Sequence, residues 1–275
     1  MLKFIVMSDL HIVPEGEVNH GIDTTSRLIS AIEHINRYHS DAELCVLAGD
    51  LTDRGDPASY ERFASHVAAL EIPALLTLGN HDARPAFLAR FGAELADATG
   101  RVNHVRDVGG YRLIVLDTLL EGKIEGDLSA EQLAWLAEKL AEAKDRPVIV
   151  VLHHVPCDLG VAMDAIKLVN GKELANVLGT HGDVRHVITG HVHKTTSGVF
   201  HGVPFTTICG NHYNLTPRLV KDFMQVPRRE GPGHIGVVLA GPETVVVHHE
   251  SFFDQNAEMP MELFEWSGPP EQAFD

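Results

Sequence analysis

Five short strand-like runs in this chain each end in residues that can bind a metal ion. The first run is residues 3–7 (KFIVM), whose apolar and β-branched character is typical of a buried strand. Asp9 and His11 follow it directly, two residues apart. In an extended segment this spacing points both side chains the same way. A carboxylate and an imidazole facing one point would suit a hard or borderline divalent ion.

Four further runs repeat this arrangement. Their terminal residues are Asp50 and Asp53 after run 43–48, Asn80, His81 and Asp82 after run 73–78, His153 and His154 after run 147–152, and His191 and His193 after run 184–189. Because sites in open α/β sheets gather beyond the carboxyl ends of strands, we expect these side chains to converge. Oxygen and imidazole ligands without thiolates favour Mn, Fe, Zn, Co or Ni. The donors are too many for one ion, and a two-metal site bridged by one carboxylate uses them economically.

Helical patterns separate the strand-like runs. The expected helices begin near residues 23–25, at 56–57 and at Ser129, and span about 84–91 and 171–180. The first can be capped by Asp23, Thr24 or Thr25, and its apolar face is Leu28, Ile29, Ile32 and Ile35. Residues 111–117 are a further buried strand. Strands that alternate with helices predict an α/β fold.

The chain becomes β-rich after residue 195. Short apolar runs at 203–208, 235–240 and 244–248 alternate with Gly/Pro turns, as in hairpins. Between them, residues 211–233 form a long polar loop that could cover the site or a partner surface. The acidic tail after residue 255 is a loosely packed terminus, a tether or an oligomer contact.

Charge and cysteine content restrict the function. The 275 residues carry a formal net charge of −16, which argues against a protein that binds nucleic-acid polymers through their phosphates. A small phosphorylated substrate remains compatible, because bound metal supplies local positive charge. Cys45, Cys157 and Cys209 are widely spaced, which favours a reducing compartment. Without a signal peptide or an apolar stretch near 18 residues, we expect a cytoplasmic protein that does not bind membranes.

The ordered set of motifs over residues 3–193 resembles the calcineurin-like metallophosphoesterase superfamily. The motifs are D-x-H, G-D-x-x-D, G-N-H-D, a strand ending in H-H, and G-H-x-H. The resemblance implies two stacked mixed β-sheets flanked by helices, an αββα sandwich with a dimetal centre at one sheet edge and a β-rich C-terminal segment. The implied division is a catalytic core over 1–194, a β-rich completion over 195–255 with a possible cap or dimer-forming loop, and a C-terminal tail over 256–275.

The resemblance also assigns roles to individual residues. It implies that one divalent ion is bound by Asp9, His11 and His193, the other by Asn80, His153 and His191, and that Asp50 bridges them. His81 resembles the family's histidine that contacts the phosphoryl oxygen or the leaving group. His20 and His212 could reach the substrate or be solvated loop residues.

Residues next to these candidate ligands are expected to have other roles. We expect Asp53 to be structural or to lie behind the ligands, and Asp82 to cap the helix that follows it. His154 is expected to orient His153 or a water molecule. Arg54 could contact a phosphate or form a surface salt bridge.

A finer resemblance is to the branch of class III cyclic-nucleotide phosphodiesterases and bacterial glycerophosphodiesterases. It rests on the simple GNHD motif, the stretch from His153 to Leu174, and the turn 231–234. The branch implies hydrolysis of small phosphodiesters by in-line attack of a metal-bridging hydroxide. A broad-specificity phosphomonoesterase or nucleotide pyrophosphatase is the nearest alternative, and a non-catalytic scaffold is the alternative from another class. The partner is then a small phosphodiester, with a homo-oligomer possible through the β-rich end.

Overall fold

The computed structural model describes residues 1–216 and 226–253, and it has the expected α/β fold. One sheet contains β1 (Leu2–Met7), β2 (Cys45–Ala48), β3 (Ala74–Thr77), β12 (His234–Ala240) and β13 (Val245–Ser251). The other contains β4 (His104–Val108), β5 (Tyr111–Leu116), β6 (Val148–Leu152), β7 (Val184–Thr189), β8 (Thr196–Phe200) and β9 (Val203–Thr207). A short pair joins β10 (Asn214–Leu215) to β11 (Arg228–Arg229).

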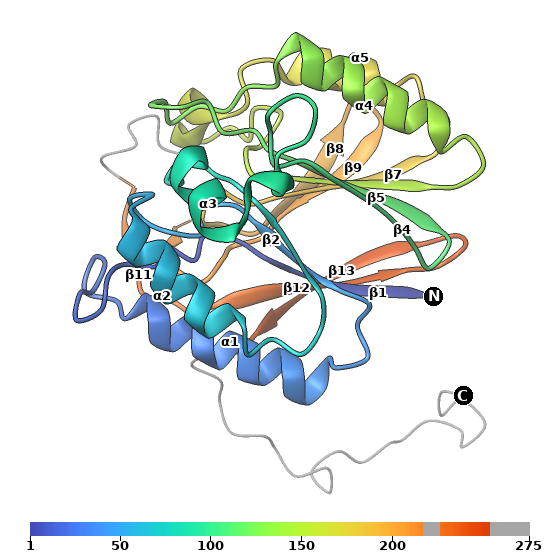
Figure 1. The fold of residues 1–275 in the computed structure, drawn as a ribbon. Helices are drawn as coiled ribbons and strands as arrows, with labels where there is room; N and C mark the ends of the chain where they lie inside the picture. Colours follow the sequence, from blue (N-terminus) through green and yellow to red (C-terminus); the bar gives the residue numbers. More distant parts are fainter. Residues whose placement is uncertain (217–225, 254–275) are drawn as a thin grey trace, which may run out of the picture.

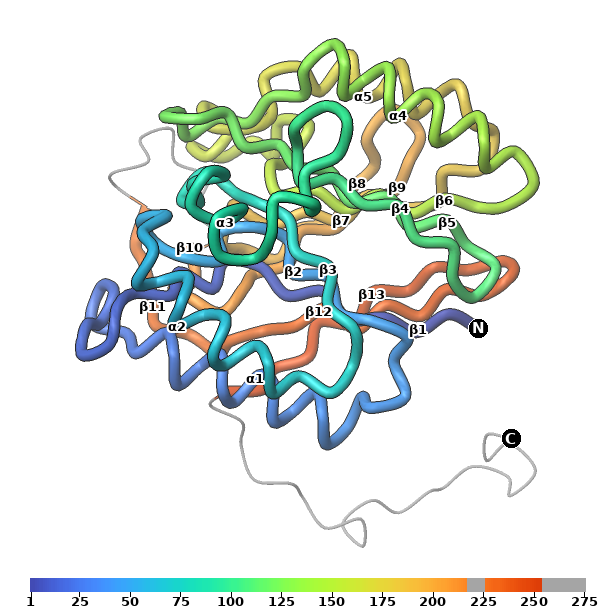
Figure 2. Tube along the Cα trace, in the orientation of Figure 1, coloured from blue at the N-terminus to red at the C-terminus, as the bar shows by residue number. Residues whose placement is uncertain are grey.

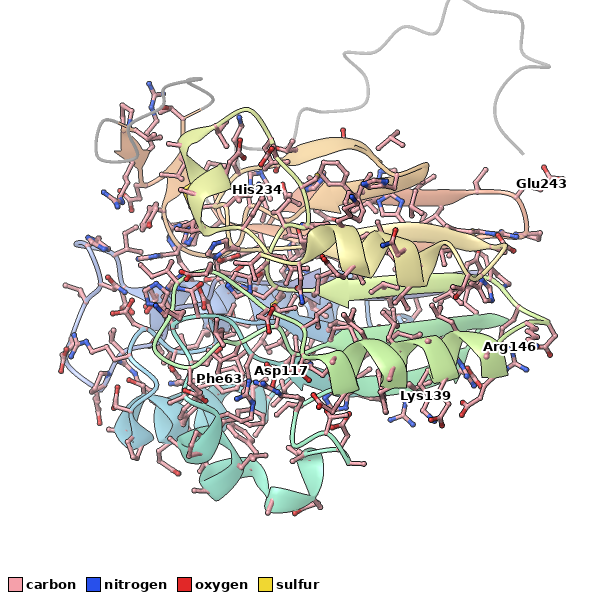
Figure 3. The ribbon with its side chains drawn as sticks, turned by 90° about the horizontal axis from the view of Figure 1, so that it is seen from above. Phe63, Asp117, Lys139, Arg146, His234 and Glu243 are labelled. Atoms are coloured by element: carbon pink, nitrogen blue, oxygen red, sulfur yellow. The ribbon has the colours of Figure 1, made fainter. Side chains whose placement is uncertain are left out.

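The two sheets stack face to face with helices on both outer faces (Figure 1). The helices are α1 (Thr24–Tyr38), α2 (Pro57–Val67), α3 (Arg84–Phe91), α4 (Ala130–Glu142) and α5 (Gly171–Leu178). The trace in Figure 2 shows α1 and α2 against one sheet and α4 and α5 against the other. Figure 3 views the second helical layer from above, with Lys139 marking α4 and Arg146 the turn after it. The predicted αββα sandwich is confirmed.

Three apolar layers hold the sandwich together, and β1 shows why. Its alternate residues Ile5 and Met7 pack with the buried faces of α1, α2 and α3, whereas Phe4 and Val6 pack between the sheets. A third layer joins the second sheet to α4 and α5. A strand buried on both faces must be apolar throughout, which is why these runs were easy to recognise.

The parallel strands direct their carboxyl ends to one edge of the sandwich. The first sheet has the order β13-β12-β1-β2-β3, in which β1, β2 and β3 run parallel. The second has the order β4-β5-β6-β7-β9-β8, in which β5, β6, β7 and β9 run parallel. The loops that follow β1, β2, β3, β6 and β7 carry the predicted ligands.

The structure adds detail that the sequence patterns lacked. Strand β4 was not predicted, because its residues are half-buried or exposed and show no apolar run. The signal was the turn Gly109-Gly110, whose φ angles of 55° and 83° suit a tight two-residue hairpin. Ile29 was expected in the apolar face of α1 but is 36% exposed, because the buried face of the helix runs through Leu28, Ala31, Ile32 and Ile35.

The β-rich end contributes to both sheets: β8 and β9 extend the second sheet, and β12 and β13 extend the first. Part of the expected 211–233 loop and all of the 256–275 tail lie outside the described residues. Among the helices that the structure describes, none is both long enough and apolar enough to cross a membrane.

Candidate metal centre

The predicted ligands come together around Asp50. The Asp50 carboxylate lies 3.3 Å from Nε2 of His153 and 3.6 Å from Nε2 of His11. Nε2 of His193 lies 3.2 Å from Nε2 of His11 and 3.4 Å from the Asp9 carboxylate. Residues from both sheets therefore meet at one point, with Asp50 between them.

The backbone at these positions is unusual. Seven non-glycine residues in the described chain have positive φ, and five of them are Asp9, His11, Asp50, His191 and His193. The prediction that Asp9 and His11 lie in an extended segment is therefore wrong: their φ angles are 55° and 47°. Left-handed conformations cost energy for residues with a Cβ atom and cluster at functional sites. Here they turn the side chains of consecutive loop residues toward the shared centre.

Each histidine is oriented through the ring nitrogen that faces away from the centre. Nδ1 of His153 lies 2.9 Å from the Ala48 carbonyl, and Nδ1 of His193 lies 2.9 Å from the Tyr213 carbonyl. Nε2 of His191 lies 2.9 Å from the Ile166 carbonyl. Each carbonyl accepts the ring N–H, which leaves the opposite nitrogen with a lone pair for a metal ion.

His11 is oriented by a carboxylate instead. Its Nδ1 lies 3.3 Å from Oδ1 of Asp53, so Asp53 stands behind the centre. The carboxylate of Asp9 is fixed from the opposite sheet, because the backbone N–H of His191 donates to both of its oxygens at 3.1–3.2 Å. These contacts hold the donor atoms in place without any ion.

Two buried atoms at the centre have no hydrogen-bond partner among the described residues. They are Nε2 of His153 and Oδ1 of Asn80. Buried polar atoms are normally satisfied, so an oxygen without a partner and a nitrogen that faces only a buried carboxylate are what a cation-binding site would provide. A Cβ on Gly79 would clash with Asp50, so that position needs glycine. The donor set fits two divalent ions.

The electrostatics of the cluster point the same way. Burial lowers the pKa of His191 to about 3 and of His193 to about 4, so both are neutral at pH 7. Although burial favours its neutral form, the neighbouring Asp50 raises the pKa of His153 to about 9. Burial also opposes ionisation of Asp50, yet the surrounding histidines, His153 first, hold its pKa well below the usual range. A cation that binds here would displace the His153 proton.

A pocket of about 280 Å³ opens above the centre. Its polar lining includes Asp50, Asn80, His81, His191 and His193. Its apolar lining consists of Ile124, Ala162, Met163, Ala165 and Ile166. His81 is exposed at this pocket, and its Nδ1 lies 2.8 Å from the Asp53 carbonyl, to which it donates. Its Nε2 is then the nitrogen left for a ligand in the pocket.

The two loop histidines lie in different places. His20 is exposed and lines the pocket. His212 is 1% exposed and packs against His11 with ring centroids 4.6 Å apart. Sequence reasoning missed Tyr213, whose ring stacks on His193 at 4.3 Å, and Arg228, whose guanidinium lies over the Tyr213 ring. Both line the pocket, and no local pattern marks them because they lie beside or in the two-residue strands β10 and β11, which are too short to show a sequence periodicity.

The expected role of Asp82 is wrong. The N-cap of α3 is Ala83, which makes no side-chain cap. The buried Asp82 carboxylate instead accepts from the backbone N–H groups of Leu51, Thr52 and Gly79 and from the Tyr60 hydroxyl. It therefore ties the loop after β2 to the loop after β3, which carry Asp50 and Asn80.

His154 and Arg54 also have defined partners. The ring nitrogens of His154 lie 2.7 Å from the Thr118 hydroxyl and 3.1 Å from the Ile124 carbonyl, so it makes no hydrogen bond that orients His153. Arg54 forms the surface salt bridge, at 2.7 Å from Glu17.

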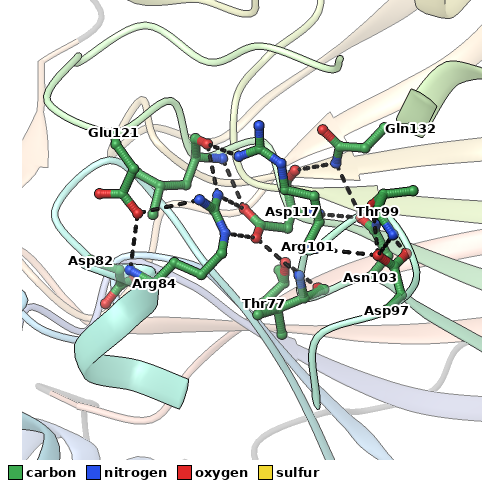
Figure 4. A network of polar contacts seen from close by, with 12 residues as sticks. Thr77, Asp82, Arg84, Asp97, Thr99, Arg101, Asn103, Asp117, Glu121 and Gln132 are labelled. Atoms are coloured by element: carbon green, nitrogen blue, oxygen red, sulfur yellow. Dashed lines mark hydrogen bonds and ion pairs between the residues drawn. The ribbon is translucent and has the colours of Figure 1, made fainter. Parts of the chain in front are cut away.

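A neighbouring strand end is built differently. Asp117 follows β5 at the same edge and is fully buried, but Arg84 donates to both of its oxygens at 2.8 and 3.0 Å (Figure 4). The backbone N–H groups of Val102 and Leu119 also donate to it. This carboxylate is fully compensated by the chain itself and needs no ion.

The order of layers and the histidine–aspartate cluster at the strand ends are together the architecture of a metallophosphoesterase. Residues 2–195 match the family model for calcineurin-like phosphoesterases. The chain belongs to this family, as its motifs predicted.

Relatives cover nearly the whole chain. A probable cyclic nucleotide phosphodiesterase of Rhodopseudomonas palustris is 35% identical over 255 residues, covering 91% of this chain and 93% of that protein. A probable glycerophosphodiester phosphodiesterase of Arcobacter nitrofigilis is 31% identical over 224 residues, covering 79% and 81%. A dimetal phosphatase from Danio rerio has a TM-score of 0.68 at 15% identity, covering 91% of this chain and 96% of that chain, which shows the shared fold.

Proposed function

We propose that this chain is a dimetal phosphodiesterase that hydrolyses small phosphodiesters, with cyclic nucleotides and glycerophosphodiesters as the leading classes. The observation that carries the proposal is the buried Asp50 carboxylate between two groups of metal-binding donors, with Nε2 of His153 and Nε2 of His11 at 3.3 and 3.6 Å from it. The relatives named for cyclic nucleotides and for glycerophosphodiesters support the substrate classes.

The donors divide into two sets on either side of Asp50. We assign Asp9, His11 and His193 to one ion, and the contacts among them support this set. Asn80, His153 and His191 form the other set, with Asp50 shared. Two divalent ions bound here would lower the pKa of a water molecule toward about 7 and supply the nucleophile.

His81 is proposed to act on the phosphoryl group. Its Nδ1–H donates to the Asp53 carbonyl, and its backbone N–H donates to Oδ1 of Asp50 at 2.9 Å, so the residue is held beside the bridging position. When the ring is protonated, Nε2–H can donate to a phosphoryl oxygen or give its proton to the leaving alkoxide. No other histidine of the centre is as exposed to the pocket.

The pocket suits a small diester. Its volume of about 280 Å³ can hold a nucleotide-sized group but not a stretch of polymer. The apolar wall around Met163 and Ile166 can contact the organic part of the substrate, while His20 and Arg228 lie at its polar side. Three cysteines without disulfides support a cytoplasmic enzyme.

The test is turnover of matched esters by metal-reconstituted protein. The panel contains bis- and mono-p-nitrophenyl phosphate, 2′,3′- and 3′,5′-cyclic AMP, and glycerophosphoethanolamine. We expect the bis ester to be preferred over the mono ester, and the ratio among the natural diesters to identify the class. Preference for the mono ester would overturn the phosphodiesterase assignment in favour of a phosphomonoesterase. No turnover with both metals bound would favour the scaffold.

A further inference from the structure

A second cluster of metal-binding side chains lies at the far end of α1. His34 is in the last turns of this helix, His39 is its C-cap residue, and Glu250 lies near the end of β13. Nε2 of His34 lies 2.6 Å from one Glu250 oxygen, and Nε2 of His39 lies 3.1 Å from the other. The three ligating atoms lie within 4.8 Å of one another.

The strand register explains why Glu250 faces the helix. It pairs with Ile235, whose side chain packs in the same apolar layer as the buried face of α1, and paired residues of neighbouring strands point to the same face of a sheet. Figure 1 shows α1 running along β12 and β13 on this side. The register therefore brings the carboxylate up to two imidazoles from a different part of the chain.

The ligating atoms are close enough together to converge on one ion. Zinc bonds to histidine nitrogen and carboxylate oxygen of about 2.0–2.1 Å place neighbouring ligand atoms about 3.3 Å apart. The observed separations of 2.6 and 3.1 Å run from the two histidines to different oxygens of Glu250, so an ion between them would move the carboxylate outward. The side chains of His34 and His39 are about nine-tenths buried, whereas that of Glu250 is 35% exposed, so a water ligand can enter from the outside.

The cluster is separate from the candidate metal centre. Thr24, at the start of α1, donates to the His11 carbonyl at 3.0 Å. His34 lies ten residues further along the same helix, which is about 15 Å at 1.5 Å per residue. A ligand of His34 therefore cannot reach the donors around Asp50.

We propose that His34, His39 and Glu250 bind a third divalent ion of borderline character, with zinc as the best match. The ion ties the C-terminal end of α1 to β13, which is an edge strand of the first sheet. Edge strands expose unpaired backbone groups, and a metal cross-link to a helix restrains such a strand. The role is structural, and it does not depend on the proposed phosphodiesterase activity.

Zinc content of the tag-free, full-length chain tests the proposal. Protein stripped with chelator, reloaded with Zn²⁺ and passed through gel filtration is measured by mass spectrometry of the metal. We expect Glu250→Gln and His34→Gln each to contain one equivalent less than the unmodified chain. His248→Gln is the matched control, because His248 lies on the same face of β13, two residues from Glu250. It should lose nothing.

Two further readouts keep the result unambiguous. Circular dichroism establishes that each variant is folded, and zinc should raise the thermal midpoint of the unmodified chain more than that of Glu250→Gln. The phosphoesterase turnover of the variants should stay unchanged, since the centre around Asp50 is intact. Equal zinc content in the unmodified chain, both cluster variants and the control would overturn the proposal. The test measures the difference in zinc content between the unmodified chain and its variants. Its outcome therefore does not depend on whether the chain is a phosphodiesterase.

Discussion

Two buried carboxylates at the same edge of the sandwich have opposite surroundings. Asp117 after β5 receives two hydrogen bonds from Arg84 and two from backbone N–H groups. Asp50 after β2 is just as buried, but its neighbours are His11, His153 and the backbone N–H of His81. A buried charge is tolerated only when it is paired, and only Asp117 finds a permanent cation in the chain.

The difference separates structural from functional carboxylates. Asp117 forms an ion pair with Arg84 at the start of α3, which attaches this helix to the loop after β5 (Figure 4). The negative charge of Asp117 is therefore neutralised by a residue of the chain itself. Around Asp50 the partners are imidazoles that can give up their protons, and the nearby Oδ1 of Asn80 has no hydrogen-bond partner among the described residues. We therefore expect bound metal ions to neutralise the negative charge of Asp50.

The largest effect is expected from Asp50→Asn. The amide keeps the shape but not the charge that both ions would share, so turnover of bis-p-nitrophenyl phosphate should fall more than about 10³-fold, because the activated water is lost. Steady-state kinetics with excess Mn²⁺ measure this. Turnover near that of the unmodified chain would show that Asp50 is not the shared ligand.

His81→Ala should lower kcat by about 10²–10⁴-fold and leave metal content unchanged, because the lost group acts on the phosphoryl group rather than on the ions. Kinetics on activated and unactivated esters, with metal analysis, check this. A loss confined to poor leaving groups would assign His81 as the proton donor. Unchanged turnover on both kinds of ester would remove its role.

Arg84→Leu removes the cation that pairs with Asp117 and should affect stability rather than metal binding. It leaves Asp117 buried without its cation, so the free energy of unfolding should fall by about 3–5 kcal/mol. Urea denaturation measures this, and the metal content of the folded fraction should stay the same. If stability is unchanged while metal content falls, Asp117 belongs to the metal centre and the contrast is wrong.

Asp53→Asn should weaken the first ion by about 10–100-fold, since Asp53 orients His11 without touching the ion itself. Isothermal titration with Mn²⁺ gives the affinity. Glu61→Gln is the matched control, because Glu61 is a surface carboxylate on α2 that pairs with Arg90 and does not line the pocket. Equal affinity in both variants would mean that the Asp53–His11 contact has no effect on binding.

The smallest effect concerns pH and the metal-free chain. Unfolded histidines protonate below about pH 6.5, whereas folded His191 and His193 stay neutral down to about pH 3 and 4. The unfolded state then binds more protons, so stability should fall as pH falls from 6.5 toward 4. His153 is protonated in both states over this window and adds no slope. Thermal midpoints of chelated protein measure this, and a midpoint that rises as the pH falls would contradict it.

Much of the fold and the choice of ligands could be read from the sequence. Strands buried on both faces are largely continuous apolar runs, so β1, β2 and β6 stand out, and the residues after them are visible as His and Asp. The groups that orient the ligand histidines could not be predicted from the sequence. They are backbone carbonyls of Ala48, Ile166 and Tyr213, and every residue has a carbonyl.

Other errors have similar causes. Asp82 precedes a helix, as an N-cap residue would. Its carboxylate instead accepts hydrogen bonds from three backbone N–H groups of two loops, and only the tertiary structure brings these groups to it. Strand β4 is missed because a half-exposed edge strand carries no apolar run. The left-handed backbone at Asp9 and His11 could not be read because Asp and His are enriched in this conformation but adopt it in only a small fraction of cases.

The central claim is that Asp50 joins two ions at the meeting point of the two sheets. Electron paramagnetic resonance of the chelated chain reloaded with Mn²⁺ tests it most directly, because ions about 3.5–4 Å apart are magnetically coupled. We predict a spectrum of exchange-coupled manganese in the unmodified chain and only isolated manganese in Asp50→Asn. Isolated manganese in both proteins, with the site saturated, would contradict the account.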